Sequence, residues 1–283
     1  MPNVTVIAVA PGRGATVLRA MPRMAVALAA SLALCWLALP AWAAPANSLQ
    51  MSIVIDDIGN NRRQGLAAIN LPGNLTFAIL PGLSHSRELA ELAHSRGRTV
   101  MIHMPMDNHG QLPLGPMGLK AGMTPDELRQ TVLAALADVP HATGLNNHMG
   151  SLLTEQTVAM NTLMPILADH NLFFLDSLTS PRSLAYRTAQ AHGVPALRRQ
   201  VFLDHERNDK FISGQFAQAL AIMEKTGSVI LIGHPYPETI AFLDWVIPLL
   251  DEAGVVLVTP EQLLQARKAV VPGSPLTVIP VGD

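Results

Sequence analysis

The sequence has few charged residues, few aromatic residues and almost no cysteine. Of 283 residues, 14% are charged, 4% are aromatic and one is Cys, and the formal net charge is −2. Globular proteins average roughly 25% charged residues, but a hydrophobic fraction of 49% excludes a disordered chain. A single Cys excludes a disulfide scaffold and a Cys-rich zinc module. No basic excess points to a nucleic-acid partner.

The first 43 residues differ from the rest of the chain. They contain three Arg and no acidic residue, and the run from Met24 to Ala46 is uncharged and apolar. A basic start, an apolar run and the small-x-small sequence Ala41-Trp42-Ala43 are typical of a secretory signal peptide. We therefore expect residues 1–43 to be a signal peptide and the mature chain to be periplasmic or secreted. The alternative is an uncleaved membrane anchor, since the run is long enough to span a bilayer.

Two residues refine this prediction. Met21 begins a more typical signal peptide, so residues 1–20 can be a misassigned start. Cys35 follows Leu34 inside the apolar run and lacks the small residue that precedes a lipidated Cys. Cleavage would leave a mature chain without Cys, which suits an oxidising compartment.

Short apolar runs recur from residue 51 onward. They are continuous rather than alternating, which is typical of parallel strands that are buried on both faces. The predicted strands are 51–55, 75–80, 99–104, 142–146, 171–175, 199–203, 228–232 and 255–258.

Helical patterns fill the intervals between these runs. Thr124 and Thr259 each begin a capping pattern, with Pro at the first helical position and Glu or Gln three residues after the cap. Other helices are predicted at roughly 62–69, 85–96, 154–169, 182–192, 211–226 and 237–252. The alternation predicts one α/β domain over residues 48–268, a closed or nearly closed (β/α) barrel, and a flexible tail at 269–283. No GxGxxG follows a strand, so a dinucleotide-binding fold is not supported.

Unusual polar residues follow the predicted strands. In a (β/α) barrel, catalytic residues gather at the carboxyl ends of the strands. In chain order these residues are Asp56, Asp57, His103, Asp107, Asn146, Asn147, His148, Asp176, Asp204 and His234.

Asp and His without Cys suit Zn²⁺ or another borderline divalent cation. Two His and one carboxylate with an open coordination position are typical of a catalytic metal site. A neighbouring Asp can then be a general base, and a further His a general acid. Each residue alone also has an ordinary explanation, such as a helix N-cap, a core His or an Asn/Gly turn.

The same segments resemble the divergent polysaccharide deacetylase branch of the NodB-like polysaccharide deacetylase superfamily. They run in order over roughly residues 51–265 and are 53–59, 102–107, 144–151, 174–180, 201–204 and 232–239. The resemblance implies an irregular (β/α)7 barrel with the NodB-like deacetylase fold. It also implies a metal-dependent hydrolase, with zinc as the expected ion, that removes acetyl groups from an envelope glycan.

The resemblance further implies a role for each site residue. Asp56 would be the catalytic base, Asp57 a metal ligand and His234 the general acid. His103 lies where the superfamily has a His-x-x-x-His motif, but an Asp stands four residues on. We expect the second His ligand to be His148, with His109 as the alternative.

The remaining polar residues are expected to orient these groups or to contact the substrate. They are Asn146, Asn147, Asp107, Asp176 and Asp204. The two amides lie roughly where the superfamily has an Arg-x-Pro-Tyr motif, which is not recognisable here.

A second function stays open from the sequence. The altered motifs favour a catalytically weak or inactive barrel that binds an envelope glycan or an envelope protein. Few aromatic residues are present for sugar stacking, so a small amide or ester substrate is a further alternative. The adjacent Asp56 and Asp57 argue against an unrelated amidohydrolase, which would have His-x-His after its first strand.

Overall fold

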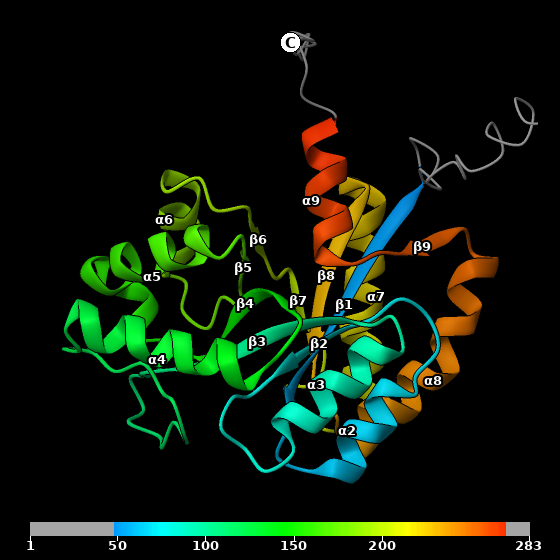
Figure 1. Ribbon diagram of the computed structural model, residues 1–283. Coiled ribbons are helices and arrows are strands. Elements are labelled where there is room, and N and C mark those ends of the chain that lie inside the picture. Colours follow the sequence, from blue (N-terminus) through cyan, green and yellow to red (C-terminus); the bar gives the residue numbers. More distant parts are fainter. Residues whose placement is uncertain (1–47, 270–283) are drawn as a thin grey trace, which may run out of the picture. The chain divides into compact units, whose positions relative to one another are not determined.

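The strands pair side by side in a parallel sheet in the computed structural model, which describes residues 48–269 (Figure 1). Their order is β6-β5-β4-β3-β2-β1-β8-β7, and β9 pairs with β1. The strands are β1 (Leu49–Ile58), β2 (Thr76–Ile79), β3 (Thr99–Met106), β4 (Ala142–Met149), β5 (Phe173–Asp176), β6 (Ala196–Arg198), β7 (Val201–Phe202), β8 (Ser228–Gly233) and β9 (Val255–Leu257).

The sheet curls because its two end strands are consecutive in the sequence. Only Arg199 and Gln200 separate β6 from β7. The backbone N–H of Arg199 donates to Asp176 on β5, and that of Gln200 donates to Ile230 on β8. This short connection draws the two edges together, so the predicted irregular (β/α) barrel is confirmed.

Most helices lie in the intervals between successive strands and pack on the outside of the sheet, whereas α9 follows the last strand and packs at one end of the barrel (Figure 1). They are α2 (Arg62–Ile69), α3 (Ser86–Ser95), α4 (Pro125–Asp138), the 3₁₀ turn η2 (Leu153–Glu155), α5 (Thr157–Asp169), α6 (Ala185–Ala191), α7 (Asp209–Thr226), α8 (Pro237–Glu252) and α9 (Pro260–Ala269). Both predicted caps form: Thr124 and Glu127 exchange hydrogen bonds at α4, and Thr259 and Gln262 do so at α9.

Several predicted boundaries were wrong. The run 199–203 is the short strand β7, and the chain enters it from β6, which the apolar pattern did not reveal. The helix predicted at 154–169 is divided into η2 and α5 at Gln156, which has an extended backbone. β4 continues to Met149, whereas the prediction ended it at 146, because its last residues pair in register with β3.

The core has two parts. Most buried side chains lie between the sheet and the outer helices. A second set, here called the inner cluster, lies inside the curled sheet and consists of Val54, Ala78, Met101, Phe173, Leu175, Leu197, Ile230, Ile232, Val258 and Leu263. Leu263 comes from α9, and β9 just before it pairs with the first residues of β1. The inner cluster is therefore closed by α9 at the end where β1 begins.

The predicted signal peptide at residues 1–43, with its alternative start at Met21, lies outside the described residues. So does the predicted flexible tail, apart from residue 269 at the end of α9. Among residues 48–269, no helix is both long enough and apolar enough to cross a membrane.

Candidate active site

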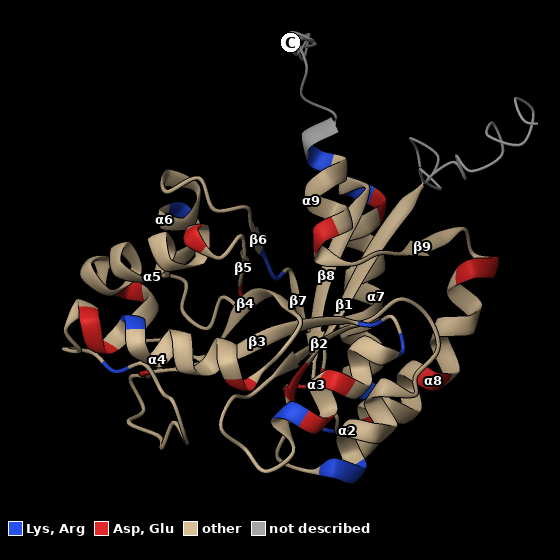
Figure 2. Ribbon diagram, viewed as in Figure 1, with Lys and Arg blue, Asp and Glu red and all other residues tan. Residues whose placement is uncertain are grey.

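The site lies at the carboxyl ends of the strands, opposite α9. Side chains alternate along a strand, so a residue two places after an inner-cluster member faces the same side. Asp56 follows Val54 in this way, His103 follows Met101, and His234 follows Ile232. Few strand positions in Figure 2 carry an acidic or basic residue. The two carboxylates at the end of β1 are therefore exceptional, and the buried one, Asp56, needs specific partners.

A bulge brings two adjacent carboxylates of β1 to the same site. The pairing of β1 with β2 shifts register between Ile55 and Ile58. Within this irregularity Asp57 has a φ of 57°, a left-handed conformation that Asp tolerates better than most residues. Bulges of this kind redirect side chains near active sites. Asp57 can therefore reach the cluster that Asp56 already faces.

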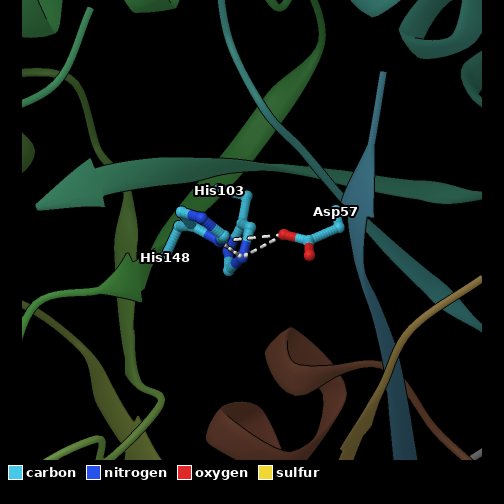
Figure 3. Close-up of side chains that lie close together, drawn as sticks. All are labelled: Asp57, His103 and His148. Atoms are coloured by element: carbon cyan, nitrogen blue, oxygen red, sulfur yellow. Dashed lines mark hydrogen bonds and ion pairs between the residues drawn. The ribbon is translucent and has the colours of Figure 1, made fainter. Parts of the chain in front are cut away.

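Three ligand-type atoms converge in front of this bulge (Figure 3). Asp57 Oδ1 lies 3.2 Å from His103 Nε2 and 2.9 Å from His148 Nδ1. The two ring nitrogens are 3.1 Å apart. His103 is buried, and the other two side chains are partly exposed.

The spacing of these atoms fits a divalent metal site. Tetrahedral ligands bound at 2.0–2.1 Å lie about 3.3 Å from one another, close to the separations here. Asp57 Oδ1 is buried and its ion-pair partners are the two His rings, so a cation held between the three atoms would replace those contacts. Burial raises the pKa of Asp57, but the adjacent His103 and His148 outweigh that effect and lower it. The carboxylate is thus ready to act as a ligand.

Asp56 lies behind this cluster and is 2% exposed. Its Oδ1 accepts a hydrogen bond of 2.8 Å from Asn146 Nδ2, and its Oδ2 is 3.5 Å from His103 Nε2. Burial raises the pKa of Asp56, although the nearby His103 and His234 oppose the shift. A carboxylate with a raised pKa accepts a proton more readily at neutral pH.

His234 faces the cluster from the end of β8 and is held by Asp204. Its Nδ1 lies 2.9 Å from Asp204 Oδ1, and its backbone N–H donates to Oδ2 at 2.6 Å. Thr239 Oγ1 also donates to Oδ2. Burial lowers the pKa of His234, but Asp204, Asp57 and Asp56 outweigh this and raise it to about 9. This shift favours the protonated ring at neutral pH, and Nε2 lies 3.7 Å from Asp57 Oδ2.

Comparison with known proteins assigns the family. The sequence model of the family described as divergent polysaccharide deacetylase matches residues 53–264. The chain belongs to the divergent polysaccharide deacetylase family.

Two relatives match this chain over most of its length. The uncharacterized protein YibQ of Escherichia coli K12 is 36% identical over 247 residues, which cover 87% of this chain and 77% of YibQ. An uncharacterized protein of Haemophilus influenzae is 38% identical over 194 residues, or 69% of each chain. The crystal structure of the uncharacterized protein ATU2773 from Agrobacterium tumefaciens C58 shares the fold. The two structures superpose with a TM-score of 0.74 and are 22% identical in sequence. The match covers 78% of this chain and 91% of ATU2773.

The geometry separates the two candidates for the second His ligand. His148 lies in β4 beside His103, not in a loop as predicted, because β4 is longer than its apolar run. His109 lies elsewhere, with Nε2 3.2 Å from Glu155 Oε1. It is therefore His148 that joins Asp57 and His103.

Three other predicted residues use their side chains to hold loops near the site. Asp107 accepts from the backbone of Ala121, and Asn147 bonds to the backbones of Met149 and Ser177. Asp176 accepts hydrogen bonds from Leu178 N and Ser183 Oγ. None of these bonds reaches the Asp57–His103–His148 cluster, and the predicted contacts with substrate stay a prediction.

A recess of about 450 Å³ opens beside Asp57 and His148. Its other walls include carboxamides, Tyr236 and several Pro and Leu side chains; the polar members are Asn60, Asn61, Gln64 and Tyr236. The sequence reasoning missed these four residues. Their position was an available signal, since the two Asn directly follow the Asp-Asp-Ile-Gly segment and Tyr236 lies between two prolines after His234.

Proposed function

We propose that this chain is an exported, metal-dependent hydrolase that removes acetyl groups from an envelope glycan. One observation carries the proposal. Asp57 Oδ1, His103 Nε2 and His148 Nδ1 converge within 3.2 Å of one another, with the buried carboxylate of Asp56 and the ring of His234 beside them. Two His and one carboxylate with room for further ligands are the donors of a catalytic Zn²⁺ site, so zinc is the ion we expect.

The three ligand residues would hold the cation, which would supply Lewis acidity toward the acetyl carbonyl and toward water. Asp56 takes the proton of the attacking water, because its pKa is raised and Asn146 holds it in place. His234 donates the hydrogen on Nε2 to the departing amine or alkoxide. Asp204 keeps the ring oriented through Nδ1 and stabilises its protonated form. The two proton-transfer groups thus approach the same reacting centre from different strands.

The recess beside the cluster suits the acetylated end of a sugar unit. Its carboxamides can bond to hydroxyl and acetamido groups, and its Leu and Pro side chains can contact the apolar face of the ring. Tyr236 is the single Phe, Tyr or Trp residue of the recess, so the recess cannot stack several sugar units on aromatic rings. We therefore favour a substrate that presents one acetylated unit.

Export is the second element of the proposal and rests on the N-terminal sequence. The basic start, the apolar run and Ala41-Trp42-Ala43 predict cleavage before Ala44. N-terminal sequencing of protein recovered from the periplasm should therefore begin at Ala44. Recovery of the intact chain from the membrane fraction would instead support the uncleaved anchor.

The test of the activity is acetate release. Zinc-loaded protein should release acetate from acetylated oligosaccharides, and Asp56→Asn should lower kcat by about 10²- to 10⁴-fold, because general base catalysis contributes about that much. Asp251→Asn makes the same chemical change at an exposed position of α8 and should leave the rate unchanged.

The alternative function predicts a different result. Bound zinc without acetate release from any member of a broad panel of acetylated glycans and small acetyl esters would contradict the deacetylase activity. Binding of the same glycans by that protein would then support a barrel that binds an envelope glycan without turnover.

A further inference from the structure

Asn146 makes two buried hydrogen bonds that join two parts of the active site. It lies on β4 with 0% exposure, in register with His103 on β3. Its Nδ2 donates to Asp56 Oδ1 at 2.8 Å, and its Oδ1 is 2.7 Å from His103 Nδ1. One side chain therefore contacts both the buried carboxylate and a ring of the metal-ligand cluster.

The chemistry of the amide determines where the hydrogens lie. An ionised carboxylate can only accept, so Asp56 must receive the amide N–H. The amide carbonyl then faces His103 and can only accept, so Nδ1 of that ring must carry a hydrogen. A His that binds a metal is neutral and carries one hydrogen, which leaves the lone pair of a metal-binding His103 on Nε2. That nitrogen is the one directed at Asp57 Oδ1 and His148 Nδ1.

We propose that Asn146 is a positioning residue that selects the Nδ1–H form of His103 and holds Asp56 beside it. The inference rests on the metal site of the proposed function, but not on the identity of the substrate. The same amide would thereby couple metal affinity to the orientation of the base. Outer-shell partners of metal-binding His commonly act in this way, and their loss lowers metal affinity by about 10- to 100-fold.

The neighbouring amide provides a matched control. Asn147 is 1% exposed, but its side chain bonds to the backbones of Met149 and Ser177 and not to the cluster. Asn146→Leu and Asn147→Leu each remove one buried amide of the same strand. A purely structural role predicts equal consequences for the two variants, whereas the positioning role predicts that only the first changes the metal site.

The first measurement is zinc affinity by titration calorimetry of folded protein. Asn146→Leu should bind zinc about 10- to 100-fold more weakly than wild type, and Asn147→Leu should bind it as wild type does. Asn146→Asp keeps an acceptor for His103 Nδ1 but cannot donate to Asp56. It should keep zinc affinity within a few-fold of wild type and lose most of kcat. Equal affinity in wild type and Asn146→Leu would overturn the proposal.

The second measurement needs no variant. A long-range ¹H–¹⁵N spectrum of zinc-loaded wild type should show a hydrogen on Nδ1 of His103 and none on Nε2. A hydrogen on Nε2, or zinc bound through Nδ1, would overturn the proposal even if a variant fails to fold. With the expected spectrum and no acetate release, the inference stands and the proposed activity fails. With acetate release and the opposite spectrum, only the inference fails.

Discussion

Val54 and Asp56 lie on the same face of β1, yet Val54 packs in the inner cluster and Asp56 lies in the active site. The same change occurs between Ile232 and His234 at β8. One end of the barrel interior is thus apolar and closed by α9, and the other is polar and open to a recess. Because different residues of the same strands form the two ends, folding stability and metal chemistry should respond to different substitutions.

The largest expected effect is at the polar end. His148→Ala removes one of three protein ligand atoms. Structural zinc sites bind with about 10–16 kcal/mol, so losing one ligand should weaken zinc binding at least about a hundredfold. Calorimetric titration measures this, and the urea midpoint of the metal-free protein should change little. His170→Ala, at an exposed position after α5, is the matched control. Unchanged zinc affinity in His148→Ala would remove this residue from the site.

A smaller effect is expected at the apolar end. Leu263 is 1% exposed and packs in the inner cluster. Buried Leu→Ala changes cost about 2–5 kcal/mol. We expect about 2 kcal/mol for Leu263→Ala, because other faces of α9 are solvated. Urea unfolding of metal-free protein measures the loss, with the exposed Leu112→Ala as control. Zinc affinity of the folded variant should match wild type, and a weakened site would show that the two ends are coupled.

The smallest expected effect is on the pH dependence of folding stability and concerns Glu155, which bonds to loops outside the cluster. The hydrogen bond from Ser180 Oγ lowers the pKa of Glu155 to about 2, and Arg182 and His109 add to the shift while burial opposes it. The ionised carboxylate therefore stabilises the fold above about pH 4.5, and this contribution disappears as pH falls toward 2.

Glu155→Gln should accordingly unfold at a lower urea concentration than wild type at pH 6, and the difference should shrink as the pH is lowered. Glu261→Gln makes the same chemical change in the first turn of α9 and is the control. A difference that grows toward acid pH would contradict the lowered pKa of Glu155. Zinc affinity at neutral pH should not change, since this carboxylate bonds to loops and not to the cluster.

Sequence patterns predicted correctly those helices that are determined by residues close together in the sequence. The helices at 62–69 and 237–252 have the predicted bounds, and the capping box at Thr124 forms as expected. The residues of the cluster were also predictable, because polar side chains after buried strands need a reason to be there. The family resemblance supplied their expected roles, which await the experiments above.

What the sequence could not show depends on contacts between strands. The bulge at Asp57 arises from the shift of β1 against β2, and the pairing of His148 opposite Pro105 arises from the length of β4. The prediction missed β6 because this strand is short and is defined by its pairing with β5 rather than by an apolar run. Gln64 of the recess was missed because only the packed fold brings α2 beside His148. Asn60 and Asn61 could have been found from their position directly after the Asp-Asp-Ile-Gly segment.

The closure of the inner cluster by α9 also bears on the order in which the chain can fold. β1 pairs with β8 and β9, which are synthesised last among the strands, and Leu263 of α9 helps to seal its inner face. Contacts between such distant parts of a chain slow folding. The ligand residues Asp57, His103 and His148 all leave the ribosome well before that seal. We therefore expect the barrel to close only after α9 has been synthesised, so that Asp57, His103 and His148 come together late in folding.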